Sequence, residues 1–75
     1  MDMVDILINV HPDLSNKERS LLETDLRDID GVISVHFSAE HPHLLTLEYN
    51  PAQTSSEALL NRIGDRGVEA SKIGL

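Results

Sequence analysis

The segment LRDIDGVISVHF, Leu26 to Phe37, changes from helical to strand spacing within a few residues. Before its glycine, apolar residues recur at intervals of four and three, which predicts a helix with one apolar face: Leu22, Leu26 and Ile29. Gly31 ends that helix, because glycine adopts a left-handed backbone without steric cost. A strand is predicted from Val32 to Phe37, and its apolar face would carry Ile33, Val35 and Phe37. A tight turn therefore joins a helix to a strand.

Upstream of this segment, Met3 to Val10 alternates between apolar and polar residues, which predicts a half-buried strand. Pro12 lacks an amide donor and holds its predecessor extended, so we expect a loop to begin at His11. Ser15 and Glu18 have the Ser-x-x-Glu spacing of a capping box. The first helix is therefore expected to start at Ser15.

Downstream, residues 44–49 predict a third strand, joined to the second by a hairpin connection at residues 38–43. Thr54 and Glu57 offer a second capping box, which would open a helix that ends near residues 64–67. Residues 68–75 would form the last strand. This order predicts one α+β domain over residues 1–75, a ferredoxin-like βαββαβ sandwich with a four-stranded antiparallel sheet and both helices on one face.

Composition excludes several functions. Thirteen acidic and six basic residues give a formal charge of −7, which repels a phosphate backbone and argues against nucleic acid as a partner. The sequence shows neither a signal peptide nor a run of apolar residues long enough to cross a membrane, so we expect a cytoplasmic protein. The chain has no cysteine, which removes thiolate metal sites and thiol nucleophiles.

The sequence resembles the heavy-metal-associated (HMA) domain family, which includes copper chaperones, mercury-binding proteins and the amino-terminal modules of metal-transporting P-type ATPases. The resemblance spans almost the whole chain and rests mainly on turn and packing positions: Asp30-Gly31-Val32-Ile33-Ser34-Val35, Tyr49-Asn50-Pro51 and Gly67-Val68-Glu69-Ala70. It implies the ferredoxin-like fold. Counting back from Gly31, the family's Cys-x-x-Cys would fall on Ser15 and Glu18.

A serine hydroxyl and a single carboxylate cannot replace two thiolates around copper(I). We therefore expect an HMA-like binding or interaction module that has lost its thiolate metal site and carries no cofactor. Its partner would be another protein or a second copy. A small ligand-binding regulatory domain is a further alternative.

The histidines support a second hypothesis about function. The predicted topology places the loop after the first strand and the hairpin at the same end of the sheet, so His11, His41, His43 and Asp13 would gather there. Imidazole and carboxylate ligands suit zinc, nickel or copper(II). The alternative function is therefore a carrier or sensor of such a metal. His36 is expected to be exposed on the open sheet face, away from the hairpin.

Ser15 and Glu18 could also be imagined as a nucleophile and its base, but a capping box accounts for both, so we expect no enzyme. Arg62, Asp65 and Arg66 are interpreted as the charged end of the second helix. Apolar residues expected on the uncovered sheet face could mark a partner surface: Met3, Leu7, Leu44 and Ile73.

Overall fold

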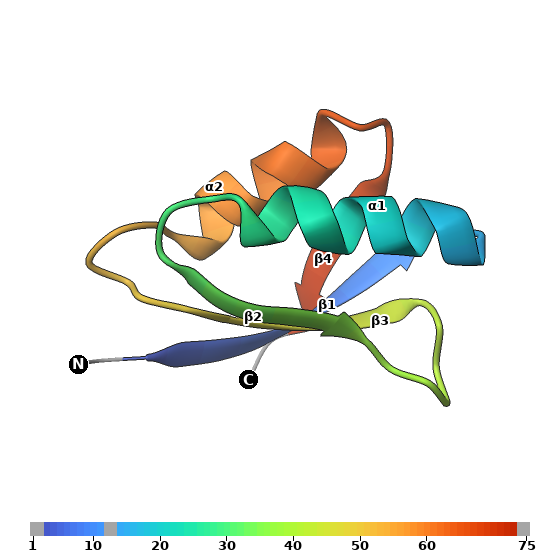
Figure 1. Ribbon diagram of the computed structural model, residues 1–75, viewed down its shortest axis with the longest axis horizontal. Coiled ribbons are helices and arrows are strands. Elements are labelled where there is room, and N and C mark those ends of the chain that lie inside the picture. Colours follow the sequence, from blue (N-terminus) through green and yellow to red (C-terminus); the bar gives the residue numbers. More distant parts are fainter. Residues whose placement is uncertain (1–2, 12–13, 74–75) are drawn as a thin grey trace.

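The computed structural model describes residues 3–11 and 14–73 (Figure 1). Its elements follow the predicted order: β1 (Val4–His11), α1 (Asn16–Arg27), β2 (Val32–Phe37), β3 (Leu44–Tyr49), α2 (Ser56–Gly64) and β4 (Glu69–Ile73). The strands form one antiparallel sheet in the order β2-β3-β1-β4. Both helices cover the same face of that sheet (Figure 1). The predicted ferredoxin-like fold is confirmed.

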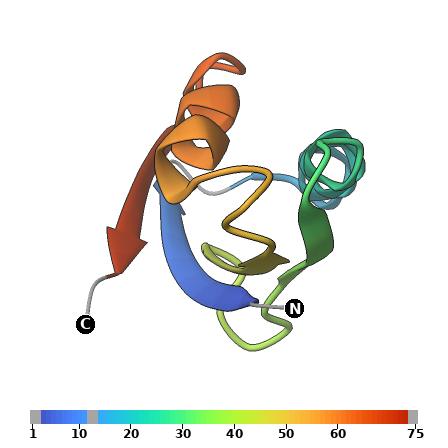
Figure 2. The ribbon, with the colours of Figure 1, turned by 90° about the vertical axis from the view of Figure 1, so that its left-hand side faces the viewer.

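The two helices lie over different halves of the sheet. Figure 2 shows α1 above the side that ends in β2, and α2 above the side that ends in β4. The opposite face of the sheet has no covering helix (Figure 1). β2 and β4 are therefore the edge strands, each hydrogen-bonded to one neighbour only.

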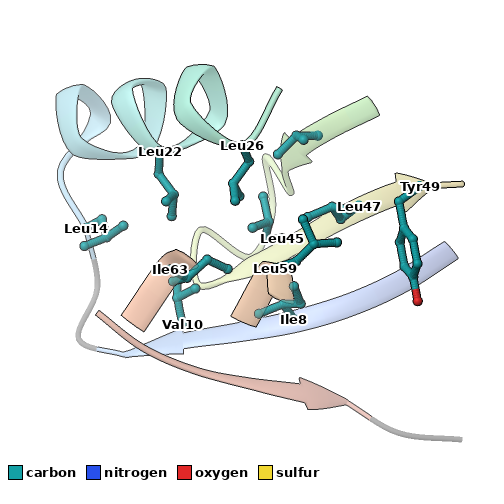
Figure 3. Packing of buried hydrophobic residues seen from close by; sticks show 11 residues of the cluster. Ile8, Val10, Leu14, Leu22, Leu26, Leu45, Leu47, Tyr49, Leu59 and Ile63 are labelled. Carbon is teal, nitrogen blue, oxygen red and sulfur yellow. The ribbon is translucent and has the colours of Figure 1, made fainter. Parts of the chain in front are cut away.

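The core is aliphatic and lies between the sheet and the helices (Figure 3). Leu22 and Leu26 of α1 and Leu59 and Ile63 of α2 have at most 1% of their surface exposed. They pack against the inward face of the strands, together with one residue of the loop before α1: Ile8, Val10, Leu14, Val35, Leu45, Leu47 and Tyr49. No polar side chain of the described residues is buried. Water-free packing of aliphatic groups therefore provides most of the stability of this small domain.

The turn that joins α1 to β2 depends on Gly31. Its φ of +99° lies in the left-handed region, and its carbonyl accepts a hydrogen bond of 2.7 Å from the Asn50 amide. A Cβ at this position would lie 2.7 Å from the Cβ of Gln53. The glycine is thus required by both backbone conformation and space.

The predicted apolar face of β2 was wrong at Ile33. Ile33 is not on the apolar face, because an irregularity in the pairing of β2 with β3 lies between Val32 and Ser34. Val32 packs against the core instead, and Ile33 is 47% exposed. A shift in pairing with one unpaired residue, here Ile33, is typical of a β-bulge at the edge of a sheet.

The second helix begins one residue later than the predicted capping box. Ser55, not Thr54, is its N-cap and accepts a hydrogen bond from the Ala58 amide. Glu57 consequently lies within the first turn and does not return to the cap residue. A single hydrogen bond, from the Ala58 amide to the Ser55 hydroxyl oxygen, therefore caps α2.

We expect Gly31→Ala to lower the free energy of unfolding by roughly 1–3 kcal/mol, because alanine must adopt a left-handed backbone and contact Gln53. Gly64→Ala is the matched control. Its Cβ would meet no atom within 4 Å, and the position is helical, so we expect a gain of up to about 1 kcal/mol. Chemical denaturation of the two variants measures both values. If both variants changed the free energy of unfolding by the same amount, the Gly31 turn would carry no strain.

Candidate functional site

The segments that carry the candidate site residues lie at one end of the molecule. The end of β1, the start of α1, the β2–β3 hairpin and the loop between α2 and β4 all lie at the same end (Figure 1). Ser15 is the N-cap of α1, so both Ser15 and Glu18 belong to this end.

Ser15 and Glu18 bind each other. The Ser15 amide donates to Glu18 Oε1 at 3.0 Å, and the Glu18 amide donates to Ser15 Oγ at 3.1 Å. The predicted capping box is therefore present. Two amides that the first helical turn would leave unpaired are satisfied. The backbone hydrogen bond from Ser15 lowers the pKa of the Glu18 carboxyl, and the Ser15 side chain adds to this effect.

Leu14 fixes the loop before α1 to the core. Its side chain is only 8% exposed and points toward Ile63 and Leu22 (Figure 3). Beside it, a shallow hollow of about 80 Å³ is lined by Leu14, Glu18, Leu21 and Arg66, among others. Leu21 is 49% exposed. Leu14 was not predicted to belong to the core, because a single leucine between Asp13 and Ser15 shows no periodicity.

The basic residues at the end of α2 and in the loop after it link the two helices. Asp25 of α1 accepts from Arg62 Nη2 at 3.0 Å and from Arg66 Nε at 3.0 Å. The hydrogen bond from Arg62 is the main cause of the lowered pKa of the Asp25 carboxyl. The interpretation of these arginines as the charged end of the second helix was therefore incomplete. They connect α2 and its following loop to α1.

The histidines are only partly brought together. His11 is the last residue of β1, paired with Glu69, and does not begin a loop as predicted, because strand pairing with β4 extends through it. The rings of His41 and His43 lie edge to face with centroids 6.1 Å apart. The His43 carbonyl accepts from the Val10 amide, which places the hairpin beside the end of β1. Asp13 lies outside the described residues.

No group of three or more potential metal ligands occurs within residues 3–11 and 14–73. His36 is exposed as expected, but it is the penultimate residue of β2 and so adjoins the hairpin, because the strand ends at Phe37. The predicted ligand set therefore stays a prediction, and the rings of His41 and His43 are the two that lie edge to face.

The uncovered sheet face carries a few apolar side chains. Leu7 of β1 pairs with Ile73 of β4, and it is half-buried while Ile73 is 44% exposed. Met3 is 53% exposed and Leu44 is half-buried beside Asn9. These residues form a sparse apolar strip among polar neighbours. Among the described residues, no helix is long and apolar enough to span a bilayer.

We expect the Glu18 carboxyl to titrate below its ordinary pKa, because the charged form accepts a backbone hydrogen bond that the protonated form loses. Ser15→Ala removes the hydroxyl contribution and should raise this pKa toward the ordinary value. Since the folded-state pKa is lowered, the stabilisation is present above the unfolded pKa and is lost as the pH falls through the folded value. Carboxyl-carbon NMR titration measures the pKa directly. Identical titration of Glu18 in both proteins would show that the Ser15 hydroxyl has no influence.

Comparisons with known proteins show what this fold resembles. No protein-family model and no curated protein matches the sequence. Among solved structures, the amino-terminal domain of a potential copper-translocating P-type ATPase from Bacillus subtilis, in its Cu(I)-loaded state, superposes with a TM-score of 0.87. It is 19% identical, and the match covers 97% of this chain and 90% of that one.

Two other structures are similar over their whole length. Oxidized MerP from Ralstonia metallidurans CH34 has a TM-score of 0.86 at 16% identity, and the match covers 97% of this chain and all of MerP. The CopZ metallochaperone has a TM-score of 0.81 at 22% identity, with 91% of this chain and 100% of CopZ covered. By name, one of these neighbours is a domain of a potential copper-translocating ATPase and another is a metallochaperone. The chain has the fold of heavy-metal-associated domains, and it has no cysteine.

Proposed function

We propose that this chain is a small cytoplasmic HMA-like module that binds another protein and has lost the thiolate metal site. The observation that carries the proposal is the capping box of Ser15 and Glu18, which occupies the positions where the resemblance puts the two cysteines. The chain keeps the scaffold and uses these two positions to start α1.

The hydrogen bonds of the capping box argue against metal capture at the same positions. Ser15 Oγ and Glu18 Oε1 each already accept an amide proton. A metal ion would have to displace these bonds and would gain only oxygen ligands, which copper(I) disfavours. Loss of an N-cap costs about 1 kcal/mol. Helix formation and metal binding therefore compete here, and the residues present favour the helix.

The same geometry supports a non-catalytic role. Serine needs a base that accepts its proton, yet Ser15 Oγ accepts the Glu18 amide and Glu18 accepts the Ser15 amide. The hollow beside Glu18 holds only about 80 Å³. A substrate would find neither an oriented base nor an enclosed cleft in this part of the molecule.

Competition with a chromophoric copper(I) chelator tests the proposal. We expect the wild-type protein to leave copper(I) on the chelator. The double variant Ser15→Cys with Glu18→Cys should remove it at one ion per chain, because the scaffold then presents two thiolates at the start of α1.

Ser15→Ala with Glu18→Ala is the matched control, since it also loses the cap and gains no thiol. Stoichiometric uptake of copper(I) by the wild-type protein would overturn the proposal. If the double-cysteine variant folds but fails to take copper(I), then Ser15 and Glu18 do not mark the family's metal positions.

The second candidate function is a carrier or sensor of zinc, nickel or copper(II). The edge-to-face approach of His41 and His43 favours it, because two imidazoles 6.1 Å apart can converge on one ion by small rotations. His11 and Asp13 would complete the predicted ligand set. A pair of histidines alone supplies half of a tetrahedral zinc site.

A two-dimensional amide NMR titration with each metal separates the two candidates. For the interaction module we expect small, non-saturating shifts near the hairpin. Saturable shifts at one ion per chain that disappear in His41→Ala with His43→Ala, and persist in His36→Ala, would establish the metal function. The His36 variant is a suitable control because His36 is an exposed histidine on the neighbouring strand.

A further inference from the structure

The two edge strands, β2 and β4, differ in whether side chains bind their outward backbone groups. At β2, the Phe37 amide donates to Glu23 Oε2 at 3.0 Å, and Arg27 Nη2 donates to the Val35 carbonyl at 2.7 Å. Glu23 and Arg27 lie four residues apart on α1, so both reach the same edge from one flank of the helix. Side chains thus satisfy outward backbone groups of β2, which hinders pairing with another strand.

β4 presents the corresponding groups without such partners. The Val10 amide points toward β3, since it donates to the His43 carbonyl. Backbone groups alternate in direction along a strand, so Asn9 points toward β4 and pairs with Ser71. The amides and carbonyls of Ala70 and Lys72 therefore point outward. Within residues 3–11 and 14–73, no side chain hydrogen-bonds to the backbone of β4.

The residues on the neighbouring side of α2 explain why β4 lacks the side-chain hydrogen bonds that β2 has. Its residues Leu60 and Gly64 have the same four-residue spacing as Glu23 and Arg27, but neither has a side chain that can form a hydrogen bond. Both line an open groove of about 680 Å³ that runs along residues 67–71 and reaches Asn9 and His11 of β1. Gly64 leaves the groove wide, because no atom lies within 4 Å of where its Cβ would be.

We propose that the outer edge of β4, together with the groove below α2, binds an extended and basic segment of a partner protein by adding it to the sheet. The backbone of the segment would pair antiparallel with Ala70 and Lys72, and its alternate side chains would enter the groove against Leu60. Such strand addition derives affinity from main-chain hydrogen bonds and specificity from pockets along the edge.

Charge selects the kind of partner. The chain carries a formal charge of −7, and Glu69 lines the groove at the start of β4. Two copies would repel each other over distances near the Debye length, and their Lys72 side chains would share one edge. A basic segment is attracted instead. Small apolar side chains fit the helix side of the added strand, and basic ones fit the uncovered side near Glu69.

This inference rests on the proposed function only in that both make the chain a protein-binding module. The surface lies on β4 and α2, away from Ser15 and Glu18. Copper(I) uptake by the wild-type protein would overturn the proposed function and leave the β4 edge untouched, whereas failure of strand addition would leave the metal result unchanged.

The test uses the alternating peptide Lys-Val-Lys-Val-Lys-Val-Lys, blocked at both ends, in an amide NMR titration. We expect saturable shifts centred on Ala70 and Lys72, slower hydrogen exchange of these two amides, and weaker binding at high salt. The peptide with glutamate in place of lysine should bind at least about tenfold more weakly. Equal binding of both peptides, or no shifts on β4, would overturn the proposal.

Selective N-methylation tests the hydrogen bonds themselves. In antiparallel addition the valines share the helix side with Ala70, so their amides face β4 and the lysine amides face away. Methylating the valine amides should abolish binding, and methylating the lysine amides should preserve it. The reverse result, or the same loss in both, would contradict the proposed pairing.

Gly64→Leu tests the groove, because the added side chain fills it without meeting another atom near its Cβ. We expect at least about a tenfold loss of peptide affinity. Asn61→Leu adds the same side chain to an exposed position of α2 outside the groove lining and should bind as the wild type does. Equal affinity of the two variants would overturn the groove assignment. Concentration-dependent shifts on β4 without peptide would instead identify a second copy as the occupant.

Discussion

One-sided burial is the constraint on which this structure depends. A chain of 75 residues has enough aliphatic side chains for a single interior, and these lie between one face of the sheet and two helices. The other face and both edges of the sheet remain in contact with solvent. The residues available for function are therefore restricted to loops, edges and an uncovered face, where they can change without loss of the core.

Ser15 and Glu18 show how two exposed residues can serve the start of a helix. At a helix start, the amides of the first turn need acceptors whatever the protein does. A serine and a glutamate three residues apart meet this local need completely. The pair therefore stabilises the start of α1 and offers only oxygen atoms, which are not soft ligands, so the fold here does not depend on a thiolate site.

Local signals predicted the elements well and long-range pairings poorly. The order of strands and helices, the Gly31 turn and the first capping box follow from spacing over a few residues. The displacement of Ile33 depends on how β2 meets β3, and the contacts of Asp25 with Arg62 and Arg66 join residues far apart in the chain. Ser55 and Thr54 are both good caps, so the choice between them depends on how α2 packs. His11 became part of β1 because β4 was available to pair with it.

The side chains of Glu23 and Arg27 have a consequence for how molecules can assemble. Cross-β growth needs two open edges on every unit, one to receive a strand and one to offer the next. Here side chains of α1 bind two outward backbone groups of β2, the Phe37 amide and the Val35 carbonyl, so β4 is the edge more open to another strand. Assembly through the sheet is therefore favoured at β4 over β2. The domain can end a sheet but does not readily continue one, and this hinders the growth of filaments.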